Sequence, residues 1–164
     1  MPKTNLPSIA QIESDFPDYS FVKDDVFHWS PRENRVYYDP KKIGEKSGIF
    51  QLLHEIGHAL LEHKSFTSSI QLLKLEVEAW EKAKDLAKNY SLTISLDHIE
   101  QCLDSYRDWL YLRSKCPNCN TTGLEANPNQ YHCFNCLQDW RVPASQRKRQ
   151  YRMKATADLG SYLS

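Results

Sequence analysis

The chain lacks the features that would place it in a membrane or on an export pathway. None of its apolar runs approaches the roughly 20 residues that a membrane-spanning helix requires. Residues 1–7 contain no apolar core of signal-peptide length. We therefore expect a cytoplasmic protein without a membrane partner.

The chain also has no net charge, no internal repeat and no low-complexity tract. Its 21 basic residues balance 21 acidic ones, and 40% of its 164 residues are hydrophobic. This composition is typical of a folded globular chain and excludes a disordered one. The charges are distributed unevenly, because residues 141–164 contain six basic residues and a single acid, Asp158. The acidic body and the basic end are therefore considered separately.

Strand-like and helix-like patterns follow one another along the chain and predict an α+β fold. A short helix is expected over residues 7–15, with Ser8 as its N-cap. Two runs rich in aromatic and β-branched residues, 19–29 and 34–39, predict an antiparallel β-hairpin. Apolar residues at helical spacing predict three longer helices, at 47–63, 68–89 and 95–114.

The segment from His54 to His58 is the most informative part of the sequence, since it reads His-Glu-x-x-His within an apolar helical pattern. On a helix, His54 and His58 project from the same face, so both imidazoles can bind one metal ion. Glu55 lies beside that position, where the general base for a metal-bound water is needed. The motif predicts a catalytic zinc site with Glu55 as the catalytic residue. A buried helix rarely carries three such polar groups without partners.

A catalytic zinc ion usually takes three protein ligands, so a third must come from another element. The helix expected at 68–89 has Glu76 on its apolar face, and a carboxylate that faces a core is costly unless it is paired or bound to metal. Glu78 falls about 200° further around this helix and is the alternative ligand. His63 is a weaker candidate, because the three-histidine pattern places its last histidine where this chain has Lys64.

The His-Glu-x-x-His frame, followed by Glu76-x-x-Ala79, resembles the ImmA/IrrE-type zinc metallopeptidases over residues 21–88. Such proteins commonly have Asn or Asp at the position of Trp80. The resemblance implies a small zincin-like domain, in which a short antiparallel sheet packs on the active-site helix and two further helices. It also implies that residues 35–39 form the sheet edge lining the cleft, where an extended peptide could pair. Gly57 fits this likeness, because a small residue there lets the active-site helix approach its neighbour.

The resemblance implies peptide-bond hydrolysis. Zinc lowers the pKa of its water, Glu55 takes the proton and then passes it to the leaving amine. Tyr106 and Tyr111 are candidate donors to the oxyanion. Relatives act on DNA-bound transcriptional repressors or regulators, so a protein substrate of that kind is expected. The alternatives are a SprT-like DNA-associated protease, a zinc-binding pseudo-enzyme, and a non-catalytic module that binds nucleic acid or protein.

A second metal site is predicted from two Cys-x-x-Cys pairs with 13 residues between them. Paired knuckles of this kind bring four thiolates around one structural zinc, as in a zinc ribbon. The ligands are Cys116, Cys119, Cys133 and Cys136. Disulfides are disfavoured in a cytosolic chain, and Cys102, the fifth cysteine, is expected in the core.

The change in composition near Lys115 predicts three parts: a metallopeptidase domain at 1–115, a zinc ribbon at 116–142 and a basic tail at 143–164. The ribbon and the basic run 147–154 make nucleic acid a candidate partner, with phosphates bound by the run and bases stacked on ribbon aromatics. Those aromatics are Tyr131 and Trp140. The alternative is an amphipathic tail helix that docks on the acidic body through Tyr151, Ala155 and Leu159.

Overall fold

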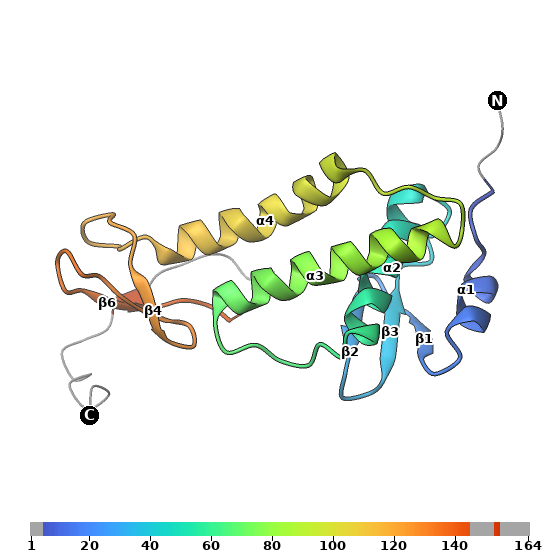
Figure 1. The fold of residues 1–164 in the computed structure, drawn as a ribbon. Coiled ribbons are helices and arrows are strands. Elements are labelled where there is room, and N and C mark those ends of the chain that lie inside the picture. The colour runs from blue at the N-terminus through green and yellow to red at the C-terminus, as the bar shows by residue number, and fades with distance from the viewer. Residues whose placement is uncertain (1–4, 145–152, 155–164) are drawn as a thin grey trace. The chain divides into compact units, whose positions relative to one another are not determined.

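The computed structural model describes residues 5–144 and 153–154, and these residues form an α+β fold, as predicted (Figure 1). The helices are α1 (Ile9–Asp15), α2 (Lys46–Leu60), α3 (Ser69–Lys88) and α4 (Leu96–Ser114). The strands are β1 (Ser20–Lys23), β2 (His28–Ser30), β3 (Arg35–Tyr38), β4 (Leu124–Asn127), β5 (Gln130–His132), β6 (Asp139–Arg141) and β7 (Met153–Lys154). Within the described part of the chain, no helix is both long and apolar enough to cross a membrane.

Packing divides the chain into two compact units. The first contains Met1–Ser65 and Lys74–Ile99, and the second contains Phe66–Leu73 and Glu100–Ser164. The division runs through α3 and α4, so it does not test whether the cysteine-bearing segment folds as a separate domain. The limits at 1–115, 116–142 and 143–164 stay a prediction. The basic run 147–154 lies outside the described residues, apart from the short strand β7.

The sheet of the first unit has the strand order β1-β3-β2, with β1 parallel and β2 antiparallel to β3. The predicted hairpin therefore exists between β2 and β3 only, and the expectation of a purely antiparallel sheet is wrong. The run 19–29 was expected to form one strand, but it divides into β1 and β2, which flank β3 on both sides. Because β3 is the central strand, the prediction that residues 35–39 form the sheet edge is also wrong.

The helices lie close to their predicted positions, and α1 begins at the predicted cap, where the Ser8 hydroxyl accepts a hydrogen bond from the Gln11 amide. Helix α2 ends earlier than expected, at Leu60. There Glu62 adopts a left-handed conformation (φ 55°), and the His63 amide donates to the His58 carbonyl at 3.0 Å. This is a Schellman motif, which stops the helix and folds the chain back beside its last turn.

Helices α2 and α3 approach closely at Gly57. A Cβ atom added to Gly57 would lie 2.7 Å from the Ala79 carbonyl oxygen, which is closer than side chains normally come. The predicted role of Gly57 as the residue that allows the two helices to approach is confirmed. Since α2 carries both histidines of the motif and α3 carries Glu76, this contact sets the distance between them.

Replacing Gly57 by Ala should therefore destabilise the protein, by about 1–3 kcal/mol as for other overpacked contacts, and weaken metal binding at the His54 and Glu76 side chains. Urea unfolding followed by circular dichroism, together with zinc titration, measures both effects. Gly44→Ala is the matched control, because a Cβ there meets nothing within 4 Å. Equal unfolding midpoints for the two variants would contradict the proposed close contact.

The second sheet has the order β4-β5-β6-β7, and its core is small. The rings of Tyr131 and Trp140 stack with centroids 5.6 Å apart, and both side chains are buried. The Tyr131 hydroxyl donates to Ser69 Oγ at 3.3 Å, and Trp140 Nε1 donates to the Arg113 carbonyl at 2.9 Å. The prediction that these two rings stack on nucleic-acid bases is wrong, because both lie inside the unit.

Candidate metal centres

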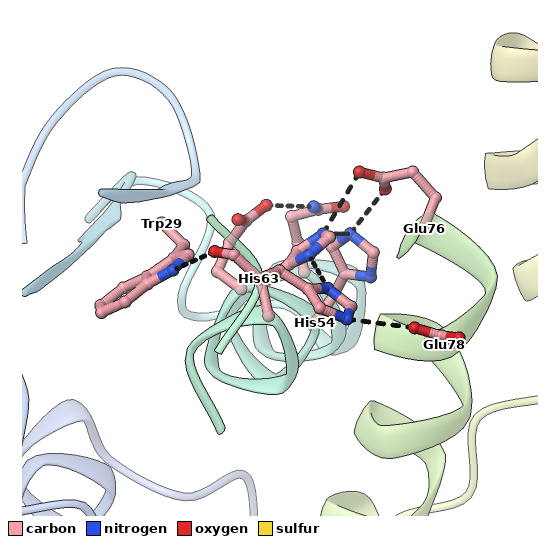
Figure 2. A network of polar contacts seen from close by, with 8 residues as sticks. Trp29, His54, His63, Glu76 and Glu78 are labelled. Carbon is pink, nitrogen blue, oxygen red and sulfur yellow. Dashed lines mark hydrogen bonds and ion pairs between the residues drawn. The ribbon is translucent and has the colours of Figure 1, made fainter. Parts of the chain in front are cut away.

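The structure brings the three predicted catalytic ligands together in the first unit (Figure 2). His54 Nε2 lies 2.9 Å from Glu76 Oε2, and His58 Nε2 lies 3.2 Å from Glu76 Oε1. The two Nε2 atoms are 3.1 Å apart. All three side chains are buried, and they come from adjacent turns of α2 and from the facing side of α3.

The donor atoms are spaced as the ligands of one metal ion are. An ion with bonds of about 2.0–2.1 Å to nitrogen and oxygen in tetrahedral geometry separates its ligand atoms by about 3.3 Å. Hydrogen bonds alone satisfy this triangle poorly, because each Nε2 carries at most one proton and the ionised carboxylate carries none, so one of the three short contacts always lacks a proton. A cation accepts all the lone pairs at once. The site of His54, His58 and Glu76 could therefore hold a metal ion.

The electrostatics of the site keep Glu76 ionised. Burial raises the pKa of this carboxyl, but hydrogen bonds with His54 and His58 and the charge on both rings outweigh burial and lower the pKa to about 2. Burial lowers the pKa of His58, and its hydrogen bond with Glu76 and the charges of Glu76 and Glu55 more than compensate, so that the pKa is raised. An ionised carboxylate is the form that binds a metal ion.

His54 is held by packing. Its ring lies against the Trp80 indole, with centroids 4.3 Å apart and planes tilted by 30°. Within the described residues, His54 Nδ1 is buried without a hydrogen-bond partner. Metal-binding histidines usually donate this second N–H to a carboxylate, carbonyl or water. Trp80, the residue that departs from the ImmA/IrrE-type pattern, therefore orients His54 by stacking on it.

His58 is held by hydrogen bonds. Its Nδ1 lies 2.9 Å from Nδ1 of His63, and His63 Nε2 lies 3.2 Å from Glu78 Oε2. Trp29 on β2 donates its indole N–H to the His63 carbonyl at 3.1 Å. Figure 2 shows Glu76 and Glu78 on α3, where Glu76 contacts His54 and Glu78 contacts His63. His63 thus contacts both the candidate ligand His58 and Glu78, the alternative ligand of the sequence analysis.

Glu55 is placed beside the ligand group and outside it. Its side chain is buried, and its Oε1 accepts a hydrogen bond from Gln51 Nε2 at 3.1 Å, one helical turn earlier on α2. Tyr106 and Tyr111, the candidate oxyanion donors, belong to the second compact unit, so their role stays a prediction. A carboxylate that is oriented but not bound to the metal can accept a proton from water.

The four predicted cysteines also form one group, in the second unit. The sulfur of Cys116 lies 3.5 Å from that of Cys136, and Cys119 and Cys133 are separated by the same 3.5 Å. Four thiolates bound to one tetrahedral zinc at about 2.3 Å are separated by about 3.8 Å. Cys102 is half-buried on α4 and is not part of this group.

The two Cys-x-x-Cys segments adopt the same turn. In each, the residue after the second cysteine donates its amide to the carbonyl of the first at 2.9 Å and has a left-handed backbone, with φ 63° at Asn120 and φ 64° at Leu137. The turns place N–H groups within hydrogen-bonding distance of cysteine sulfur. For example, Asn135 Nδ2 donates to Cys119 Sγ at 3.5 Å. Hydrogen bonds with Asn135 and Thr121 lower the pKa of Cys119 to about 5. Burial instead raises the pKa of Cys116, so the thiolate is favoured at Cys119 in particular. The four sulfurs together could hold a metal ion.

The sequence identified the donor atoms of both groups but missed the residues that support them. Trp29, Trp80 and Gln51 contact His63, His54 and Glu55. Of these contacts, only that of Gln51 with Glu55 could have been predicted from the sequence, because residues four apart on a helix are neighbours. The chain matches no protein-family model, no curated protein and no solved structure.

Proposed function

We propose that the protein is a zinc-dependent metalloendopeptidase with one catalytic and one structural zinc ion. The observation that supports this most strongly is the buried convergence of His54, His58 and Glu76, with Glu55 next to them and outside the ligand group. The resemblance of the same residues to the ImmA/IrrE-type metallopeptidases supports the same reaction. The second ion would be held by the cysteine group of a zinc ribbon.

Each residue of this site has a separate role in the proposed hydrolysis. Zinc held by His54, His58 and Glu76 would supply a water of lowered pKa and a positive charge beside the scissile carbonyl. Glu55 takes a proton from the attacking water on its carboxylate as the new carbon–oxygen bond forms. The same carboxyl then gives that proton to the amine nitrogen as the carbon–nitrogen bond breaks. Gln51 keeps the Glu55 carboxylate in place through its amide donor.

We propose that the substrate is a protein that binds in extended form along the edge strand β2. Within the described residues, β2 pairs with β3 on one side only, and it packs against α2. An edge strand offers backbone groups that can pair with a peptide. The resemblance favours an intracellular regulator of transcription as the protein that is cut.

A matched pair of variants tests the proposal. Wild-type protein should contain two zinc ions per chain and should cut members of a proteome-derived peptide library, with new termini identified by mass spectrometry. Glu76→Gln should retain one zinc and cut none. Glu78→Gln should retain both, because an amide oxygen at that position still accepts a hydrogen bond from His63.

Each outcome has a separate meaning. If Glu76→Gln retains two zinc ions while Glu78→Gln loses one, Glu78 is the ligand. A wild-type protein with two zinc ions that cuts no peptide would contradict the peptidase and favour a non-catalytic scaffold. Glu81→Gln, an exposed change on the same helix, controls for loss of charge.

A further inference from the structure

We propose that His63 is a positioning residue, held by Trp29 and Glu78, which fixes the ring orientation and the tautomer of His58. This inference rests on the proposed metal site but concerns residues outside its ligand group. A histidine can present Nε2 to a metal ion in many orientations about its side-chain bonds. A directional partner on Nδ1 selects one of them.

The backbone first places His63 beside His58. The Schellman motif at the end of α2 turns the chain at Glu62 and bonds the His63 amide to the His58 carbonyl at 3.0 Å. The two imidazole rings consequently lie with centroids 5.1 Å apart and planes at 66°. Trp29 holds the same backbone from β2, because its indole N–H donates to the His63 carbonyl.

When His58 binds a metal ion, only one arrangement of protons allows both hydrogen bonds, the one from His58 to His63 and the one from His63 to Glu78. Nε2 of His58 must then offer its lone pair, so the proton of the neutral ring is on Nδ1. That N–H donates to Nδ1 of His63, 2.9 Å away, which must be unprotonated. The proton of His63 is therefore on Nε2, where it donates to Glu78 Oε2 at 3.2 Å.

The series of hydrogen bonds ends at the Glu78 carboxylate, which also has a lysine near it. Glu78 Oε1 lies 3.8 Å from Lys74 Nζ, one turn earlier on α3. His63 is thus held from β2, from the end of α2 and from α3, all in the first unit. His54 has no comparable arrangement, since its Nδ1 has no hydrogen-bond partner in the described structure. We expect His58 to be the ligand whose geometry depends on hydrogen bonding.

Cobalt binding to the full-length protein tests the proposal without relying on activity. The metal affinity of the histidine site is measured by competition with a chromophoric chelator, and its geometry by the visible spectrum of bound Co²⁺. The thiolate bands of the cysteine site serve as an internal reference. His63→Leu should weaken binding at the histidine site by about 10- to 100-fold and alter its spectrum, with the cysteine site unchanged.

Rescue by a conservative change separates positioning from a general structural effect. The amide oxygen of His63→Asn can accept the Nδ1 proton of His58, so this variant should bind cobalt more tightly than His63→Leu. His28→Leu, a histidine that stacks on Tyr37, is the control and should not alter either site.

The possible failures are distinct. A wild-type protein that binds cobalt only through its cysteines would overturn the proposed metal site itself. A wild-type protein with two sites and a His63→Leu variant of equal affinity and spectrum would overturn the positioning role alone. If His63→Leu does not fold, Glu78→Leu replaces it, because Glu78 is partly exposed, and an unchanged affinity in that variant would likewise overturn the role.

Discussion

Glu55→Gln should abolish peptide cleavage while the zinc content and the unfolding midpoint stay those of the wild type. Glutamine has the shape of glutamate, and its carbonyl oxygen can still accept the hydrogen bond that Gln51 donates to Glu55. It cannot take a proton from water. Loss of a general base lowers rates by about 100- to 10,000-fold. The rate is measured on the library peptides that the wild-type protein cuts, with zinc content determined on the same samples.

The control for this variant is Glu45→Gln, an exposed change at the start of the same helix whose side chain makes no cap hydrogen bond, and it should leave the rate unaltered. A Glu55→Gln protein that cuts at the wild-type rate would exclude Glu55 as the base. If the variant instead loses one zinc ion, Glu55 acts on metal binding. These two results are separated by the zinc measurement, which does not depend on knowing the natural substrate.

The residues of both candidate metal centres could be predicted because their grouping is set by local geometry. Residues four apart on a helix share a face, which places His54 with His58. The same periodicity places Glu76 on the buried face of α3 and turns Glu78 away from it. The matching Cys-x-x-Cys segments likewise fix their own turns, since each needs only five consecutive residues.

The sheet could not be predicted in the same way, because strand order depends on contacts between distant residues. The run 19–29 has β-propensity throughout, yet it forms two strands that lie on opposite sides of β3. β-Propensity indicates that a segment can form a strand, but it does not determine which other strands pair with it. The support of His58 by His63 was missed for a related reason. It depends on a left-handed residue at Glu62, which is not a glycine and gives no sequence signal.

The predicted role of the ribbon aromatics failed because short strands do not reveal which face is buried. Tyr131 and Trp140 lie opposite each other in the register of β5 and β6, and both side chains face the same small core. Large rings are the main source of apolar area in such a core. An exposed aromatic does remain in this unit at Phe134, which is 68% exposed.

Cys133→Ser should unfold the second sheet at physiological temperature. Apart from the cysteines, the buried apolar core of this sheet consists, among the described residues, of Tyr131, Trp140 and Val142, while Leu124, Phe134 and Leu137 are 62–69% exposed. So small a core requires a metal ion, and a structural zinc contributes about 10–16 kcal/mol in comparable small domains. The stacked Tyr131 and Trp140 rings report the loss directly through near-ultraviolet circular dichroism, and strong chelators should produce the same change in the wild-type protein.

Cys102→Ser is the matched control, because Cys102 lies on α4 outside the four-cysteine group, and this variant should retain two zinc ions. Glu76→Gln provides the complementary control, since it should lose the other ion while the near-ultraviolet signal of the sheet persists. A Cys133→Ser protein that retains only one zinc ion and yet keeps the wild-type signal would show that the sheet is stable without its metal. If the wild-type protein instead binds no zinc at its cysteines, the close approach of the four sulfur atoms needs another cause, such as disulfide formation, which the molecular mass under non-reducing conditions would reveal.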